Sequence, residues 1–144
     1  MLEKRKLKVA QLSEKTRSAL KKIFPAWMPV NNPIDLYPAI ELAGYISVFD
    51  QACDIVLDDP NVDVMVLHYL AGVQDQIMDL AALKKKSDKV GKAVLFWLVG
   101  TEEMTRKFRR EAQIHGIPVY SEISRAVECM SAAARFQRMK GRTL

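Results

Sequence analysis

Two histidines are the side chains of this chain best suited to chemistry, because an imidazole can transfer a proton or accept a phosphoryl group near neutral pH. His68 stands inside the apolar run from Val64 to Leu70, and His115 directly precedes Gly116. For His68 two interpretations are open: a phosphoryl-accepting nucleophile, or a strand side chain packed near the end of a sheet. His115 is predicted to stand at a helix end, where a partial positive charge is favourable, so we expect a structural role.

The other reactive side chains lack companions at a useful spacing. Asp58 and Asp59 are adjacent carboxylates without further ligands nearby, which predicts a capped or solvated turn rather than a metal site. Cys53 and Cys129 each lie in an amphipathic pattern, and we expect two free, buried thiols. The sequence contains neither a phosphate-binding loop ending in Gly-Lys nor the glycine pattern of a dinucleotide site. No Ser/His/Asp set is identifiable by spacing, although such sets need not be sequential.

Length and composition predict one soluble domain. The chain has 144 residues, of which 49% are hydrophobic and 27% charged, so we expect a single unit over 1–144 with a basic tail over 135–144. No run approaches the roughly 18–20 apolar residues that span a bilayer, which predicts no membrane partner. The charged start, Met1 to Lys6, lacks the apolar core of a secretory signal, so we expect a cytoplasmic protein.

The net charge of +5 is the one global feature that bears on ligands. Such a balance could attract phosphates, CoA-like anions or nucleic acid, but it is also typical of solvated helix faces. No recognition motif with interleaved aromatic residues accompanies the basic ones, so a nucleic-acid partner is not expected. The basic residues cluster within 1–8, 84–86, 106–110 and 135–142.

Apolar periodicity and turn residues predict strands that alternate with helices. Ser13 and Thr101 are predicted N-caps, and Gly91 and Gly116 are predicted to end helices. The run ending at Leu70 indicates a strand that is covered on both faces. The predicted elements are an edge strand over 7–12, helices over 13–24 and 40–57, a strand over 62–70, a helix over 74–90, a strand over 93–99, a helix over 101–116, a short strand over 117–120, and a last helix to about 139 capped by Ser121 or Ser124.

Tryptophans and the proline-rich loop are expected to anchor this fold. The segment Ala26 to Met28 is predicted to hold its loop against the core, and both Trp27 and Trp97 are expected to be core or interface anchors.

This order of elements predicts an α/β fold: a three-layer, flavodoxin-like parallel sheet. Ligands of such folds bind beyond the carboxyl ends of the strands. Residues 71–74, 100–102 and 120–121 are therefore expected on the functional rim, and the loop over 31–36 is expected to join them. Asn32 and Asp35 could bond loop amides in a structural turn or orient a partner or ligand. The candidate binding residues are Asn32, Asp35, Ala71, Gly72, Val73 and Gln74.

Short motifs along nearly the whole chain resemble the NDP-forming acyl-CoA synthetases, which are relatives of succinyl-CoA ligase. Each motif is weak alone, but their order is specific. The chain is similar to the flavodoxin-like subdomain that corresponds to the carboxyl-terminal part of the succinyl-CoA ligase β subunit. The matching stretches are Leu-Ser-x-x-Thr at 12–16, Asn-Pro-Ile-Asp-Leu at 32–36, Asp-Pro-x-Val-Asp at 59–63, Gly-Lys-Ala-Val at 91–94, Gly-Ile-Pro-Val-Tyr at 116–120 and a Glu-Ile-Ser-Arg-Ala-Val helix start at 122–127.

The resemblance implies a larger enzyme with its chemistry on other modules. Such ligases pass phosphate between a nucleotide and an acyl-CoA through a phosphorylated histidine. The histidine, the nucleotide and CoA are held by a second flavodoxin-like module, an ATP-grasp module and a CoA-binding module. The present subdomain is thought to direct a helix N-terminus at the phosphohistidine, which suits an anion. The family's phosphohistidine lies in a Ser-His-Thr-Gly-like loop that this chain lacks, which favours the structural interpretation of His68.

Two departures from the family pattern matter. Where relatives open the phosphate-facing helix with Gly-Gly or Thr-Pro-Gln, this chain reads Ala71-Gly72-Val73; Val73 would crowd a phosphate, and an inward Asp75 would repel one. The family's first strand and glycine turn are also missing before Leu2. We expect that gap to be closed by pairing with another chain, by rearrangement of the sheet, or by the rest of a longer protein.

The resemblance leads to the expected function. The chain would be a non-catalytic subdomain that assembles an acyl-CoA synthetase and shapes its phosphate site, inactive alone and without a cofactor of its own. The complete enzyme would use CoA, ADP/ATP and magnesium to convert acyl-CoA, ADP and phosphate into acid, CoA and ATP. Expected partners are the CoA-binding, phosphohistidine and ATP-grasp modules, and a homo-oligomer is also expected. The alternative is a small-ligand module that binds CoA or a nucleotide.

Overall fold

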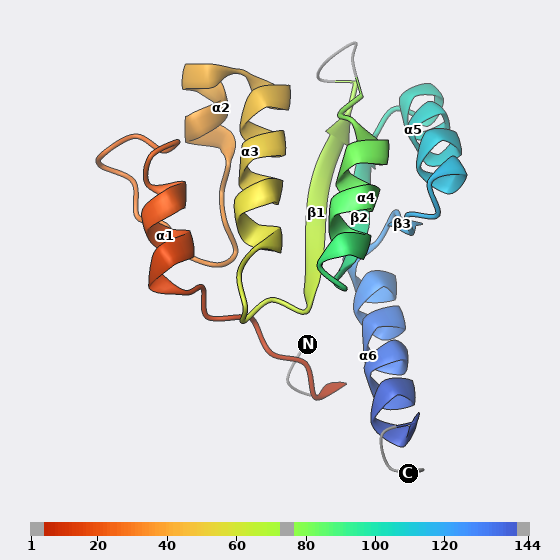
Figure 1. Cartoon of the computed structure of the whole chain (residues 1–144). Coiled ribbons are helices and arrows are strands. Elements are labelled where there is room, and N and C mark those ends of the chain that lie inside the picture. The colour runs from red at the N-terminus through yellow and green to blue at the C-terminus, as the bar shows by residue number, and fades with distance from the viewer. Residues whose placement is uncertain (1–4, 73–76, 141–144) are drawn as a thin grey trace.

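The computed structural model describes residues 5–72 and 77–140, and these form an α/β unit (Figure 1). Within them, no helix has both the length and the apolar character needed to cross a membrane. The helices and strands are α1 (Glu14–Leu20), α2 (Tyr37–Ala43), α3 (Tyr45–Leu57), β1 (Val64–Ala71), α4 (Leu80–Lys89), β2 (Ala93–Gly100), α5 (Glu102–Ile114), β3 (Val119–Tyr120) and α6 (Ile123–Lys140).

The three strands form one parallel sheet in the order β1-β2-β3. Val64 pairs with Ala93 at the start of β1, and Ala71 pairs with Gly100 at its end. Each connection between neighbouring strands contains a helix, as parallel pairing requires. The prediction of an α/β fold with a flavodoxin-like parallel sheet is therefore confirmed.

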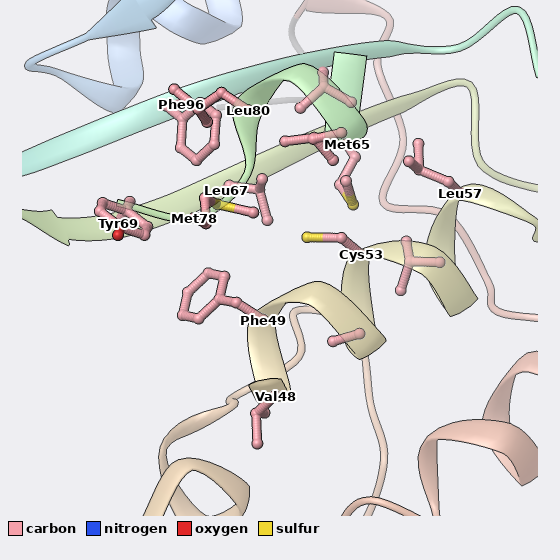
Figure 2. Packing of buried hydrophobic residues seen from close by; sticks show 14 of the residues in the cluster. Val48, Phe49, Cys53, Leu57, Met65, Leu67, Tyr69, Met78, Leu80 and Phe96 are labelled. Atoms are coloured by element: carbon pink, nitrogen blue, oxygen red, sulfur yellow. The ribbon is translucent and has the colours of Figure 1, made fainter. Parts of the chain in front are cut away.

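The main core lies on one face of the sheet. The inward side chains of β1 are Met65, Leu67 and Tyr69, and side chains of α3 and of the start of α4 lie over them (Figure 2). Phe108 of α5 packs against the Tyr69 ring. Aromatic rings join the layers: the rings of Phe49 on α3 and Tyr69 are 5.6 Å apart, and those of Phe108 on α5 and Phe96 on β2 are 4.9 Å apart. Burial of these aromatic side chains and their ring contacts stabilise the packing of the helices on the sheet.

The opposite face is covered over only part of its width. Helix α6 packs against β2 and β3, and Leu95, Ala126 and Val127 are buried there, apart from the main core. On β1 the side chains of this face remain accessible, with exposed fractions of 37% for Val64 and 41% for Leu70. The prediction that this strand is covered on both faces is wrong, because β1 is the edge strand and α6 does not extend across it.

Local capping signals place several helix ends correctly. The Ser13 hydroxyl accepts from the Thr16 amide at 3.2 Å, and the Thr101 hydroxyl accepts from the Met104 amide at 3.4 Å. Gly116, at a φ of 66°, follows the end of α5, a conformation that glycine adopts without strain. The predicted helix starts at Ser13 and Thr101 are thus confirmed.

Other predicted boundaries are wrong for local reasons. Gly44, at a φ of 84°, divides the predicted helix over 40–57 into α2 and α3. Asp79 caps the Ala82 amide at 2.8 Å, so α4 begins later than the predicted start at Gln74, which lies outside the described residues. The last helix begins at Ile123, so neither Ser121 nor Ser124 directly precedes its first residue, whereas its end at Lys140 agrees with the predicted end at about 139.

The amino-terminal segment does not form the predicted edge strand over 7–12. Its carbonyls accept from side chains instead of from a neighbouring strand: Asn32 Nδ2 donates to Ala10 O at 2.9 Å, and Asn61 Nδ2 donates to Gln11 O at 2.8 Å. Within the loop segment from Ala26 to Met28, Met28 packs against the core as predicted, whereas the Trp27 side chain is 76% exposed and is not a core anchor.

Candidate functional site

The carboxyl ends of β1 and β2 form the rim where such sheets bind ligands. Ala71 and Gly100 are paired at this end. A Cβ on Gly100 would lie 2.5 Å from the Ala71 carbonyl oxygen, and a Cβ on Gly72 would lie 3.0 Å from Met104 Cγ. Two glycines therefore allow β1, β2 and α5 to meet closely, and the described rim is built mainly from backbone.

The start of α5 gives this rim a negative character. Glu102 and Glu103 occupy the first turn of α5 and are exposed, while the Thr101 side chain already caps the Met104 amide. Arg106 is the partner of Glu102, at 2.9 Å between Nη2 and Oε1. Carboxylates favour a helix N-terminus electrostatically but compete with a bound phosphate for the same amides.

The predicted site residues are only partly brought together. Ala71 and Gly72 lie on the rim, whereas Val73 and Gln74, with Asp75, lie outside the described residues. The Asn32 side chain donates a hydrogen bond to the Ala10 carbonyl. The next residue, Gln11, accepts one from Asn61, which lies shortly before the start of β1. Asn32 is thus near the amino end of β1, which as a strand of eight residues rises by roughly 23 Å to its carboxyl end.

Asp35 forms a local turn. Its Oδ1 accepts a hydrogen bond from the amide of Tyr37, the first residue of α2, at 3.0 Å. Of the two interpretations of Asn32 and Asp35, the structure shows the hydrogen bonds of a structural loop for both. It does not bring Asn32 to Gly72.

A fully buried carboxylate, Asp59, is the strongest polar feature of the described residues. Its Oδ2 accepts from the Ser13 amide at 2.8 Å, and its Oδ1 accepts from the Asn61 amide at 2.8 Å. Burial alone would raise the pKa of Asp59, but hydrogen bonds from Thr16, Asn61 and Ser13 together hold the pKa below its usual value. The Lys92 ammonium also donates to the Asp59 carbonyl oxygen.

Asp59 therefore joins the start of α1 to the turn before β1. The predicted turn role was correct in kind, but its tertiary partner in α1 was missed. An aspartate directly before a proline and a strand gives no signal of a hydrogen-bond partner 46 positions away.

Neither histidine stands at the rim. His68 lies in β1 and stacks on Trp97 of β2, with ring centroids 4.1 Å apart, on the partly covered face. Trp97 Nε1 donates to the Ser121 carbonyl oxygen at 3.3 Å. His115 directly follows α5, and its Nε2 lies 3.3 Å from Oε1 of Glu111, one turn earlier on the same helix.

The two thiols differ in environment. Cys53 is buried in α3, and burial raises its pKa to about 12, so the thiol is a poor nucleophile. Cys129 is exposed, which corrects the expectation that both thiols are buried. A hydrogen bond with Cys129, together with burial, raises the pKa of Tyr120 to about 12. No group of three or more His, Cys, Asp or Glu side chains within 5–72 and 77–140 could hold a metal ion.

A hollow of about 340 Å³ lies between the start of α4 and the outer side of α5. Its floor includes Met78 and Leu80, and its polar side chains are Asp79, Lys107, Glu111 and His115. Asp79 already caps α4 and Glu111 is near His115, and the Lys107 side chain lines the same hollow. The sequence pattern did not single out this hollow, because its residues come from two separate elements.

Comparison with known proteins shows what the chain is similar to. It is 28% identical over 137 residues to acetate–CoA ligase [ADP-forming] II of Archaeoglobus fulgidus, which covers 93% of this chain and 20% of that protein. It is 34% identical over 65 residues to the alpha subunit of acetate–CoA ligase [ADP-forming] II of Pyrococcus furiosus, covering 45% of this chain and 13% of the subunit. No family model matches the chain.

A solved structure supports the same assignment of the fold. The protein PH0766 of Pyrococcus horikoshii superposes with a TM-score of 0.72 at 26% identity, over 91% of this chain and 30% of that one. The chain thus spans between about a fifth and a third of the proteins that it matches over most of its own length.

Proposed function

We propose that this chain, which is related to one segment of the NDP-forming acyl-CoA synthetases, is a non-catalytic subdomain that serves the assembly of such an enzyme. The predicted relationship to that family is confirmed by the similarity to two ADP-forming acetate–CoA ligases and by the structural neighbour. One observation carries the proposal: almost the whole chain aligns with only 20% of the Archaeoglobus ligase. The chemistry of a complete ligase would then depend on modules beyond this segment.

The geometry of the described residues supports a role without chemistry. His68 is stacked on Trp97, His115 is at a helix end beside Glu111, and Cys53 is buried with a raised pKa. Both carboxylate oxygens of Asp59 accept backbone hydrogen bonds, which connect the start of α1 to the turn before β1. None of these groups is aimed at the rim of Ala71 and Gly72.

The cofactors of a complete ligase do not fit the described rim. Glu102 and Glu103 oppose the phosphates of CoA or ADP/ATP, and the described residues offer no cluster for magnesium. A phosphate-shaping role would rest on Gly72, Val73 and Gln74, of which the last two lie outside the described residues.

The proposal is tested with the purified chain. The chain is incubated with acetyl-CoA, ADP, phosphate and magnesium, and ATP formation is measured; we expect none above a protein-free blank. The matching segment of the Archaeoglobus ligase is then replaced by this chain, with a deletion of the segment as the control. Activity of the chimera above that of the deletion supports the assembly role, and turnover by the isolated chain contradicts it.

A second candidate function is a small-ligand module that binds CoA or a nucleotide. The hollow beside Lys107 and the net charge of +5 favour it. Calorimetry with CoA, ADP and ATP separates the two functions: saturable micromolar binding that is lost in Lys107→Glu supports the ligand module, and the absence of heat supports assembly.

The proposal extends to the partners and the cellular location of the chain. We propose that the chain contacts CoA-binding, phosphohistidine and ATP-grasp modules in the cytoplasm and that the assembled enzyme is oligomeric. Sedimentation of the chain with the remaining modules of the Archaeoglobus ligase checks the contacts, since an unchanged sedimentation coefficient would argue against them.

A further inference from the structure

The outer edge of β1 is unpaired along most of its length in residues 5–72 and 77–140. One bond shows which backbone groups point outward: the Leu70 amide donates to the Tyr45 hydroxyl at 3.3 Å, away from β2. Because successive amides of a strand alternate in direction, the amides of Val66 and His68 point to the same side as that of Leu70. The edge is therefore open from Val64 to His68 and closed by Tyr45 at Leu70.

The residue types of this edge offer none of the usual protection against pairing. Exposed edge strands commonly carry lysines, prolines, inward charges or bulges. The eight residues of β1 read VMVLHYLA and include no proline, lysine, arginine, aspartate or glutamate. The outward side chains form an apolar stripe, in which Val66 is 36% exposed between Val64 and Leu70.

The size and surroundings of the edge decide what fits it. Val64, Val66 and Leu70 together expose on the order of 200 Å², against roughly 800 Å² per partner in a stable interface of globular proteins. Helix α3 lies beside β1 on the side away from β2, in contact through Tyr45 and Phe49 (Figure 1). A second copy that paired edge to edge would bring its own α3 to the same place. A single extended segment has no such helix.

We propose that the edge of β1 between Val64 and His68 binds an extended segment of a partner polypeptide, which adds a strand to the sheet. Main-chain hydrogen bonds to Val66 and His68 would supply the affinity. The apolar stripe selects a segment that is uncharged and β-branched at alternate positions, because a charge placed against it would be desolvated without a partner. This inference does not depend on the ligase relationship.

The test uses the full chain and a peptide of alternating threonine and valine, as long as β1 and with a lysine tail. Nuclear magnetic resonance follows the backbone amides of the protein during titration. We expect saturable changes in amide chemical shift that are largest at Val66 and His68. The changes should be smaller at Met65 and Leu67, whose amides point toward β2. The same peptide with alternate backbone nitrogens methylated should bind at least about tenfold more weakly. A methylated nitrogen has no hydrogen to donate, so the peptide loses hydrogen bonds to the carbonyl oxygens of the edge.

A matched pair of variants locates the site. Val66→Lys should weaken binding of the unmethylated peptide by about tenfold, whereas Ile114→Lys, at an exposed position on α5, should leave it unchanged. Hydrogen exchange of the free protein should be faster at the Val66 and His68 amides than at Met65 and Leu67, and the peptide should slow it.

Three results would overturn the proposal. The first is the absence of saturable shifts with the wild-type chain, and the second is equal binding of the methylated peptide. The third is a dimer of the free chain in analytical ultracentrifugation that Val66→Lys abolishes and Ile114→Lys preserves, since a second copy would then occupy the edge.

Discussion

The Tyr45 hydroxyl on α3 accepts a hydrogen bond from the Leu70 amide on β1, with 3.3 Å between oxygen and nitrogen. The bond closes the carboxyl end of an otherwise open strand edge next to the rim at Ala71. It also satisfies a phenol that is buried against Phe49 and Tyr69. Burial raises the pKa of Tyr45 to about 12.

Removing this hydroxyl should open the end of the edge. Tyr45→Phe leaves the Leu70 amide without its acceptor, and we expect a loss of about 1 kcal/mol in the free energy of unfolding. Urea denaturation measures the loss, and hydrogen exchange should become faster at Leu70. Tyr37→Phe, at an exposed tyrosine on α2, is the control and should change neither quantity. Unchanged exchange at Leu70 in Tyr45→Phe would contradict the assignment.

Asp59 should be one of the most sensitive polar positions of the fold. Asp59→Asn replaces a buried carboxylate that accepts from Ser13 and Asn61, and places an amide donor against those donors. We expect a loss of about 2–4 kcal/mol in the free energy of unfolding, measured in urea. Asp58→Asn is the matched control: Asp58 is 3.3 Å from Lys86 at the surface, so its loss should be about 0.5 kcal/mol or less. Equal effects at the two positions would show that the Asp59 contacts contribute little.

The same carboxylate should make stability dependent on acid pH. The pKa of Asp59 is lower in the folded chain than in the unfolded one, so the unfolded state takes up the proton first as the pH falls. Its contribution is therefore complete above the ordinary aspartate pKa of about 4 and is lost as the pH falls through the lower, folded value. Urea midpoints between about pH 6 and pH 2 should fall more steeply for the wild type than for Asp59→Asn. Parallel curves would exclude the effect.

Gly100 should not tolerate a side chain. Gly100→Ala places a Cβ 2.5 Å from the Ala71 carbonyl oxygen, so β1 and β2 must separate at the rim. We expect a loss of about 2 kcal/mol or more in the free energy of unfolding. Gly91→Ala is the control: it has a φ of 68° and no atoms within 4 Å of a new Cβ, so only backbone strain of about 1 kcal/mol is expected. Thermal unfolding compares the two variants, and a smaller effect at Gly100 would contradict the close approach.

Local signals predicted the elements that depend on neighbouring residues. Ser13 and Thr101 start helices because a hydroxyl one position before the first turn can accept from its free amides. Gly116 ends α5 because it adopts a positive φ without strain. Gly44 has the same conformational freedom, but it lies within a continuous apolar pattern, so the break between α2 and α3 was not predicted.

The candidate site was predicted less well, because its composition depends on distant contacts. The general rule for parallel sheets correctly placed Ala71 and Gly72 at the carboxyl end of β1. The rule does not place a loop that precedes the first strand, and Asn32 is held near the opposite end by Ala10.

The sequence by itself determined the class of fold, the helix starts at Ser13 and Thr101, and the similarity to a segment of ADP-forming acetate–CoA ligases, since each depends on residues that are adjacent or in a fixed order. Only the tertiary structure decided that β1 is an edge strand with one open face. An apolar run such as Val64 to Leu70 has the same local pattern at the centre of a sheet as at its edge. Which strand and helix lie beside it depends on contacts with residues far away in the chain.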